Sequence, residues 1–141
     1  MKKDVLINVL SSQSVDGQED NMEISVVGKL EHGGEKYTIE YTEYDGDMEG
    51  CNTTISAFNG DCVSVLREGG YASEMLLENK RRHTCLYSTP YGDLTIGIYT
   101  KKITSDMTDV GGTLEMEYTI DFGSGSPSEN KMKITVSERD V

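Results

Sequence analysis

Apolar and polar residues alternate with a period of two along much of the chain. The clearest run, L-E-M-E-Y-T-I-D-F at 114–122, places five apolar side chains on one face and four polar ones on the other. Such alternation is typical of a β-strand with one buried face. Similar runs lie at 22–26, 37–41, 94–98 and 132–136, and weaker ones at 4–10, 52–58, 62–67, 72–78 and 82–88. No run has the stripe of an amphipathic helix, and only 72–79 is ambiguous, so the pattern predicts an all-β chain.

Turn-forming residues separate nearly all of these runs. Asn-Gly, Asp-Gly and Gly-Gly pairs supply the positive φ angles of tight hairpins, and Thr89-Pro90-Tyr91-Gly92 forms a further corner. The turns recur about every ten residues, the spacing of antiparallel all-β folds. Successive hairpins leave little room for crossing connections. We therefore predict one domain over 1–141, an antiparallel up-and-down β-barrel of about eight to ten strands, with a two-sheet sandwich as the alternative.

The chain is acidic, with 25 Asp and Glu against 13 Lys and Arg and a formal net charge of −12. A surface of this sign repels nucleic-acid phosphates and anionic membranes, so neither is an expected partner. No stretch is long enough to cross a bilayer, and Asp4 and Asn8 interrupt the short apolar run after the N-terminal lysines. The three cysteines are odd in number and lack CxxC spacing, which predicts reduced thiols in a cytoplasmic protein.

Two charged residues continue apolar rows at strand ends and mark a candidate binding site. Glu43 continues the row of 37–41, and Arg67 continues the row of 63–65. In a meander both strand ends lie at the same end of the barrel as the Thr-Pro-Tyr-Gly corner at 89–92. An inward Arg and Glu would form an ion pair, because an unpaired buried charge is costly. The alternatives are such a rim ion pair without a ligand, and a mouth at which Arg67 receives a ligand carboxylate or phosphate.

The leading hypothesis for the function of the barrel is the binding of a small amphipathic, anionic molecule in or at its mouth. The candidate ligand-binding residues are Arg67, Glu43, Tyr41, Tyr87 and Tyr91. A barrel of this size holds either packed side chains or one small ligand. Only 30 of the 141 residues are Leu, Ile, Val or Phe, which indicates an under-filled interior and favours the ligand. The alternative function is a filled structural barrel that acts as a protein–protein interaction module, and a homodimer is compatible with both.

The sequence contains no recognisable catalytic or metal-binding constellation. His32 and His83 are its two histidines, and neither belongs to a helical zinc motif. Cys62 and Cys85 could meet His83 across strands, but no spacing supports a zinc site. Alternating carboxylates at 45–49 do not match a calcium-binding EF-hand loop. We therefore predict a protein that is not an enzyme and that carries no metal or cofactor.

Several segments resemble one family of proteins, in order and over nearly the whole chain. They are Y-T-E-Y at 41–44, V-L-R-E-G-G at 65–70, Y-S-T-P-Y-G-D-L at 87–94, G-G-T-L-E-M-E-Y at 111–118 and N-K-M-K-I-T-V at 130–136. The third segment is the most specific, with Tyr91 where Phe is common. On these segments the chain resembles the YwiB-like family of uncharacterised bacterial proteins. The resemblance implies a calycin-type (lipocalin-like) β-barrel and cytoplasmic residence, and it implies no activity or catalytic residue.

Overall fold

The computed structural model describes residues 2–34, 36–42, 52–58, 61–68, 73–89, 92–108, 110–121 and 127–138. Every regular element in these ranges is a β-strand, which confirms the all-β prediction. The strands are β1 (Lys2–Val15), β2 (Gln18–Gly33), β3 (Lys36–Thr42), β4 (Asn52–Phe58), β5 (Cys62–Glu68), β6 (Ser73–Glu78), β7 (Arg82–Thr89), β8 (Gly92–Thr108), β9 (Gly111–Asp121) and β10 (Ser128–Glu138). Each of the alternating runs in the sequence corresponds to one of these strands.

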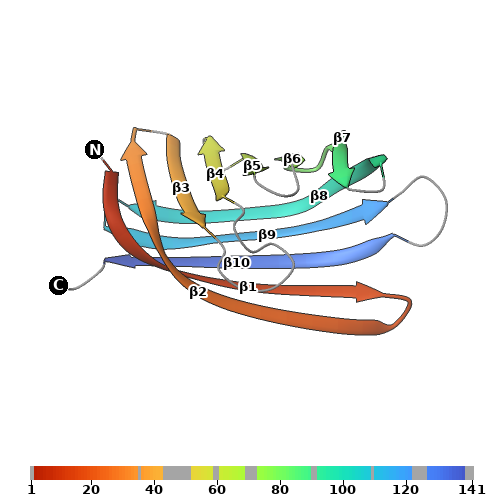
Figure 1. The fold of residues 1–141 in the computed structure, drawn as a ribbon, viewed down its shortest axis with the longest axis horizontal. Helices are drawn as coiled ribbons and strands as arrows, with labels where there is room; N and C mark the ends of the chain where they lie inside the picture. Colours follow the sequence, from red (N-terminus) through yellow and green to blue (C-terminus); the bar gives the residue numbers. More distant parts are fainter. Residues whose placement is uncertain are drawn as a thin grey trace.

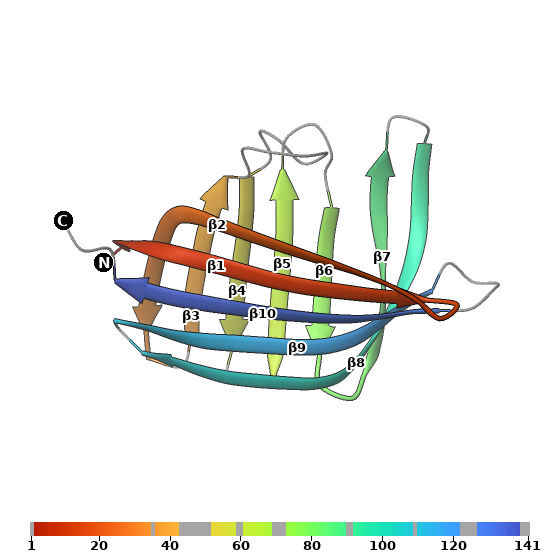
Figure 2. The same cartoon turned by 90° about the horizontal axis from the view of Figure 1, so that it is seen from below.

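The strands form a closed antiparallel barrel. Each strand pairs with its neighbours in sequence, and β1 pairs with β10 to close the ring, so the predicted up-and-down barrel is confirmed. The barrel is flattened into two crossing layers, because β3 to β7 run across β8, β9, β10 and β1 (Figures 1 and 2). The pairing of β6 with β7 is the sparsest in the described ranges, with Ser73 and Tyr87 as its register pair.

β2 and β8 belong to both layers, and each has an irregularity where one layer gives way to the other. Gly28 lies where β2 begins to pair with β3. A Cβ at Gly28 would overlap the carbonyl oxygen of Glu40 and Cδ1 of Ile7, so glycine permits a close approach of the two strands. In β8 a register shift between Thr100 and Lys102 marks a bulge. Bends and bulges of this kind let a strand turn a barrel corner.

The first hairpin is longer than the alternation predicts. The runs at 4–10 and 22–26 predict a connection at 11–20 between them, and this prediction is wrong: the β1–β2 ladder continues to a two-residue turn. Asp16 and Gly17 form the turn with φ angles of 51° and 83°, as a type I′ hairpin requires. β8 likewise runs to Thr108, well beyond the alternating run at 94–98, and takes up much of the interval before the run at 114–122, where a connection at 104–111 is predicted. Both extensions are rich in polar residues, so they show no apolar alternation that would identify them as strands.

Apolar side chains from strands around the barrel pack into one buried cluster. Its largest fully buried members are Ile7, Leu30, Ile39, Ile55, Leu77, Ile98, Leu114, Met116 and Ile134. Buried Tyr and Met side chains supply volume that the low content of Leu, Ile, Val and Phe does not. Much of the interior is therefore filled, and this limits where a ligand could enter.

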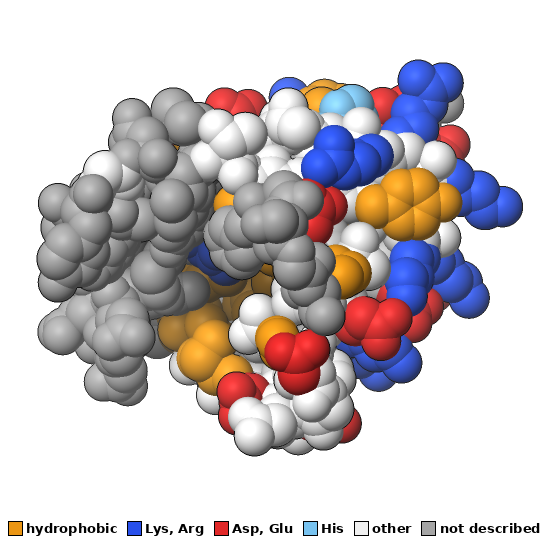
Figure 3. All heavy atoms as spheres, turned by 90° about the vertical axis from the view of Figure 1, so that its right-hand side faces the viewer, with side chains coloured by type: hydrophobic (Ala, Val, Ile, Leu, Met, Phe, Trp, Pro, Cys, Tyr) orange, Lys and Arg blue, Asp and Glu red, His pale blue; other side chains and the backbone are white. Residues whose placement is uncertain are grey.

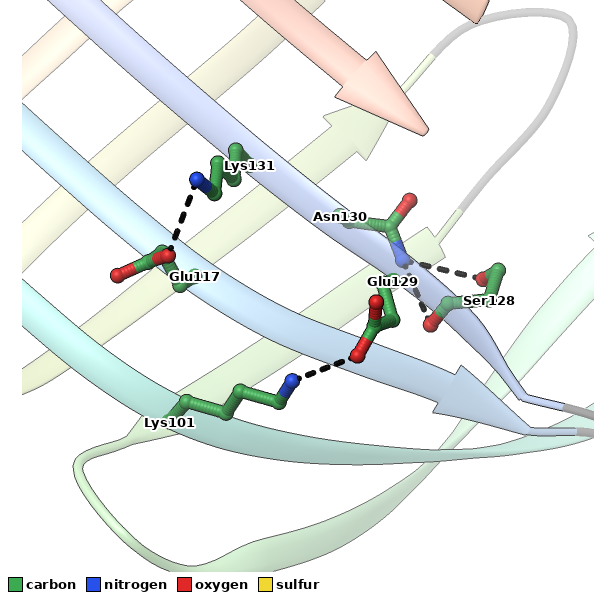
Figure 4. Close-up of polar contacts among 6 residues, drawn as sticks. All are labelled: Lys101, Glu117, Ser128, Glu129, Asn130 and Lys131. Carbon is green, nitrogen blue, oxygen red and sulfur yellow. Dashed lines mark hydrogen bonds and ion pairs between the residues drawn. The ribbon is translucent and has the colours of Figure 1, made fainter. Parts of the chain in front are cut away.

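The outer face of β8 to β10 carries cross-strand ion pairs. Lys131 Nζ lies 3.5 Å from Glu117 Oε1, and Lys101 donates a 2.8 Å hydrogen bond to Glu129 (Figure 4). The hydrogen bond and charge of Lys101 lower the pKa of the Glu129 carboxyl below its ordinary value. The carboxylates of this face are thus solvated surface groups, as their position on the polar side of the alternation predicts.

Candidate functional site

A first row of polar side chains crosses the layer formed by β3 to β7. Each residue of this row is paired, in the strand register, with one residue on the next strand. The row consists of Tyr41, Thr53, Arg67, Ser73 and Tyr87. Three predicted site residues, Tyr41, Arg67 and Tyr87, therefore share one cross-strand row by backbone register, although the side chains of Ser73 and Tyr87 are not among those described. Glu43 and Tyr91 lie outside the described residues, so the expected ion pair of Arg67 with Glu43 stays a prediction.

A second polar row crosses the opposite layer. Its members are paired from β8 through β9, β10 and β1 to β2. The row consists of Thr100, Tyr118, Asn130, Gln13 and Asp20. Thr100 and Tyr118 are buried, Asn130 is half-buried, and Gln13 and Asp20 are exposed. The row therefore leads from the buried interior to solvent along the β1–β2 hairpin.

A cavity of about 220 Å³ brings the two rows together. It is lined by Ser11, Ser12, Gln13, Asp20, Asn21, Arg67, Tyr118, Asn130, Lys131 and Met132. Arg67 reaches it from β5, whereas the other lining residues come from β1, β2, β9 and β10. Viewed from the end where the β1–β2 hairpin turns, the molecule is hollowed, with hydrophobic and basic side chains inside the hollow (Figure 3). We call the cavity of about 220 Å³ the mouth cavity.

Arg67 and its neighbours leave hydrogen-bonding capacity unused. Arg67 Nε is buried and has no hydrogen-bond partner among the described residues, and the same holds for the hydroxyls of Thr53 and Thr100. Thr53 is the direct cross-strand neighbour of Arg67. A buried polar group without a partner costs about 1–3 kcal/mol, so such groups ordinarily find a partner in water or a ligand.

The Tyr118 phenol lies close enough to Arg67 for the arginine charge to affect its pKa. Burial raises the pKa of Tyr118 above its ordinary value, and the positive charge of Arg67 offsets part of the rise. The phenol is therefore neutral at physiological pH and can donate a hydrogen bond. Arg67 and Tyr118 together present donors to the inner side of the mouth cavity, which is the arrangement that an anion requires.

Tyr41 does not line the mouth cavity, and its predicted role in ligand binding stays a prediction. Tyr41 is buried and is separated from Arg67 by Thr53 of β4, and it lines an outer groove that also includes Lys29 and Glu40. The tyrosine that lines the cavity with Arg67 is Tyr118, which was not among the tyrosines predicted for the site. The place of Tyr118 on the buried side of the run 114–122 was visible in the sequence, but the closure of the barrel that brings it to the same cavity as Arg67 was not.

The remaining reactive side chains are held in other contacts. His83 Nε2 lies 2.9 Å from Glu78 Oε1, and His32 stacks on Tyr37. Burial raises the pKa of both described thiols, Cys62 and Cys85, so neither is an activated thiolate. Across the described ranges no three His, Cys, Asp or Glu side chains gather as a metal site would require. The carboxylates at 45–49 lie outside these ranges.

Within the same ranges there is no helix long and apolar enough to span a membrane. The cytoplasmic location stays a prediction.

Comparison with known proteins identifies the fold and leaves the activity open. A family model described as Domain of unknown function (DUF1934) matches residues 7–134. The crystal structure of the ywiB protein from Bacillus subtilis superposes with a TM-score of 0.88 at 22% sequence identity, covering 99% of this chain and 94% of that one. No curated protein matches the chain. The YwiB-like resemblance is thus confirmed, while the calycin assignment within it stays a prediction.

Proposed function

The chain belongs to the family of the Domain of unknown function DUF1934, and from this premise we propose that it binds the anionic group of a small molecule in the mouth cavity. The observation that carries the proposal is Arg67, whose Nε is buried without a partner among the described residues. The Thr53 hydroxyl beside it is in the same condition. A carboxylate or phosphate in the cavity would accept hydrogen bonds from the Arg67 guanidinium and from the Tyr118 phenol, which both line it.

The size and lining of the mouth cavity restrict the ligand. Its 220 Å³ corresponds to the volume of about seven liquid waters and lies below the range of about 300–1,000 Å³ typical of drug-sized ligands. Apart from Met132, its lining residues are polar or charged, or carry a phenol. The proposal is therefore for a compact polar molecule that carries an anionic group, and the apolar tail of an amphipathic ligand finds little matching surface here.

Arg67→Ala tests the proposal. We expect it to weaken binding by about 10- to 150-fold, because a hydrogen bond to a charged group contributes about 1.5–3 kcal/mol. Fold stability should stay the same or rise, since the substitution removes a buried donor that has no partner among the described residues. Native mass spectrometry of freshly purified protein, compared with its denatured mass, detects a retained ligand, and calorimetry with carboxylates and phosphates measures affinity.

Arg81→Ala is the matched control, because the Arg81 side chain is 71% exposed and does not line the mouth cavity. It should bind like the wild type. If Arg67→Ala instead destabilises the fold and leaves anion binding unchanged, Arg67 serves as a structural rim charge and the proposal is wrong.

The alternative function, a protein–protein interaction module, is favoured by a separate observation on the outer face. Leu6, Leu10 and Val27 are 47%, 43% and 42% exposed, and Leu6 pairs directly with Val27. These three residues, which we call the outer strip, border two grooves of about 620 and 360 Å³. Contiguous exposed apolar side chains on a soluble protein are typical of an interface.

The partner that fits the outer strip is a second copy of the chain. The register places Lys133 and Glu23 on opposite sides of Leu10 in one cross-strand row. A twofold axis along β1 would set Leu10 against Leu10 and Lys133 against the Glu23 of the second copy. This row carries one positive and one negative charge, so two copies can meet at it without repulsion. Elsewhere the net charge of −12 makes two copies of the chain repel each other.

Leu10→Glu is expected to shift a dimer to monomer by at least about tenfold in dissociation constant, because the two new carboxylates would meet at the axis. Sedimentation equilibrium measures the shift. Leu76→Glu, an exposed leucine on β6, is the control and should leave the mass unchanged. A wild type that stays monomeric at high concentration contradicts the interface.

A further inference from the structure

We infer that the ligand of the mouth cavity is a zwitterion of the size of an amino acid, with its carboxylate at Arg67 and its ammonium group at Asp20. The inference rests on the proposed function and names the ligand class more closely. Two opposite charges line the same cavity of about 220 Å³. Arg67 lies at the buried side, with Nε inaccessible to solvent, and Asp20 lies at the exposed side on the β1–β2 hairpin.

Groups that suit a carboxylate and groups that suit an ammonium both line the cavity. The inner side presents the Arg67 guanidinium and the neutral Tyr118 phenol, which are the groups that a carboxylate binds. Toward the rim, Asn130 donates its amide nitrogen to Ser128 Oγ at 3.0 Å and to the Ser128 carbonyl oxygen at 3.3 Å (Figure 4). The Asn130 side-chain oxygen is a hydrogen-bond acceptor, and Asn130 and Asp20 line the same cavity. An ammonium group needs acceptors of this kind.

The second cation in the lining does not compete for the ligand carboxylate. Lys131 Nζ lies 3.5 Å from Glu117 Oε1, and the Lys131 side chain is 73% exposed on the outer face (Figure 4). Its charge is therefore directed away from the cavity. Asp20, by contrast, has no ion-pair partner among the described residues.

The charge of the whole protein favours a zwitterion over a simple anion. The chain has a net charge of −12, and the hairpin turn next to the rim adds Asp16 and Glu19 to Asp20. The negative charge of the protein would repel an anion that carries no compensating positive charge. The rest of such an anion would also lie beside the Asp20 carboxylate without pairing with it. A molecule with no net charge avoids the repulsion and can pair with both ends of the cavity.

The test uses the free protein amino acids and, for each, the 2-hydroxy acid in which a hydroxyl replaces the ammonium group at nearly the same size. Ligand-observed NMR on the full chain finds binders, and calorimetry measures their dissociation constants. We expect at least one amino acid to bind. Its 2-hydroxy acid should bind more weakly, by a factor of up to about five, which is the effect of losing an ion pair at an exposed rim.

Asp20→Asn should remove most of this preference by weakening the amino acid about fivefold while leaving the 2-hydroxy acid unchanged. Asp16→Asn is the matched control: it removes the same charge from the same hairpin, does not line the cavity, and keeps a residue that tolerates the positive φ of the turn. It should bind both ligands like the wild type.

The possible failures are distinguishable. If 2-hydroxy acids or other carboxylates bind in an Arg67-dependent way and amino acids bind no better, the zwitterion is wrong and the anion site stands. Amino-acid binding that Asp20→Asn does not change also overturns the inference. Binding that Arg67→Ala leaves intact, or no binding of any anion, overturns the proposed function and the inference together.

Discussion

Leu77→Ala is expected to lower the free energy of unfolding by about 2–5 kcal/mol, whereas Leu76→Ala, one residue earlier in β6, should change it by about 0.5 kcal/mol or less. Leu77 is fully buried and pairs across the sheet with buried Val63, so its truncation leaves a cavity in the core. Leu76 is 37% exposed on the other face, where its truncation leaves no enclosed void.

Urea unfolding monitored by circular dichroism measures both free energies. The pair is informative because the two variants share the strand, the residue types and the chemical change, and differ in the face of the sheet. β6 is also the strand whose sequence was ambiguous between strand and helix. Equal losses for the two variants would contradict the alternation of β6 and with it the register that places Arg67 opposite Ser73.

The strands could be predicted because burial on one face forces an alternation that is visible in single runs. The run 114–122 shows the pattern most clearly, and β9 follows it. The same reasoning explains why the strand pairing over 11–20 was not predicted. In the outer half of the β1–β2 hairpin, mostly polar residues of the two strands pair with one another and so satisfy their backbone groups, and no apolar signal is needed there.

The site could be predicted only in part, because a binding site in a barrel depends on which strands face one another. Arg67 was identified from a charged residue that continues an apolar row. Its opposition to Tyr118, and the position of Asp20 on the same cavity, follow from closure and register, which no single run encodes. Hydrophobic alternation fixes which face a side chain takes, and leaves open its partners across the barrel.

The bend of β2 carries the second large effect that we expect. Gly28→Ala should lower the free energy of unfolding by about 3 kcal/mol or more, at the upper end for overpacking of a core. The added methyl group would overlap the Glu40 carbonyl oxygen and Ile7 Cδ1, and would lie 3.1 Å from Tyr41 Cβ. Because one of these atoms is backbone, the β2–β3 ladder itself must separate.

The control for this variant lies in the same strand. Gly33→Ala places its methyl group where no atom lies within 4 Å, so its unfolding free energy should be unchanged or about 0.5 kcal/mol higher, through the reduced entropy of the unfolded chain. Thermal unfolding separates the two outcomes, since a loss of 3 kcal/mol corresponds to a fall in Tm of about 10 °C for a domain of this size. If Gly28→Ala unfolds at the wild-type temperature, β2 and β3 do not approach closely at this bend, and the corner of the barrel must be formed in another way.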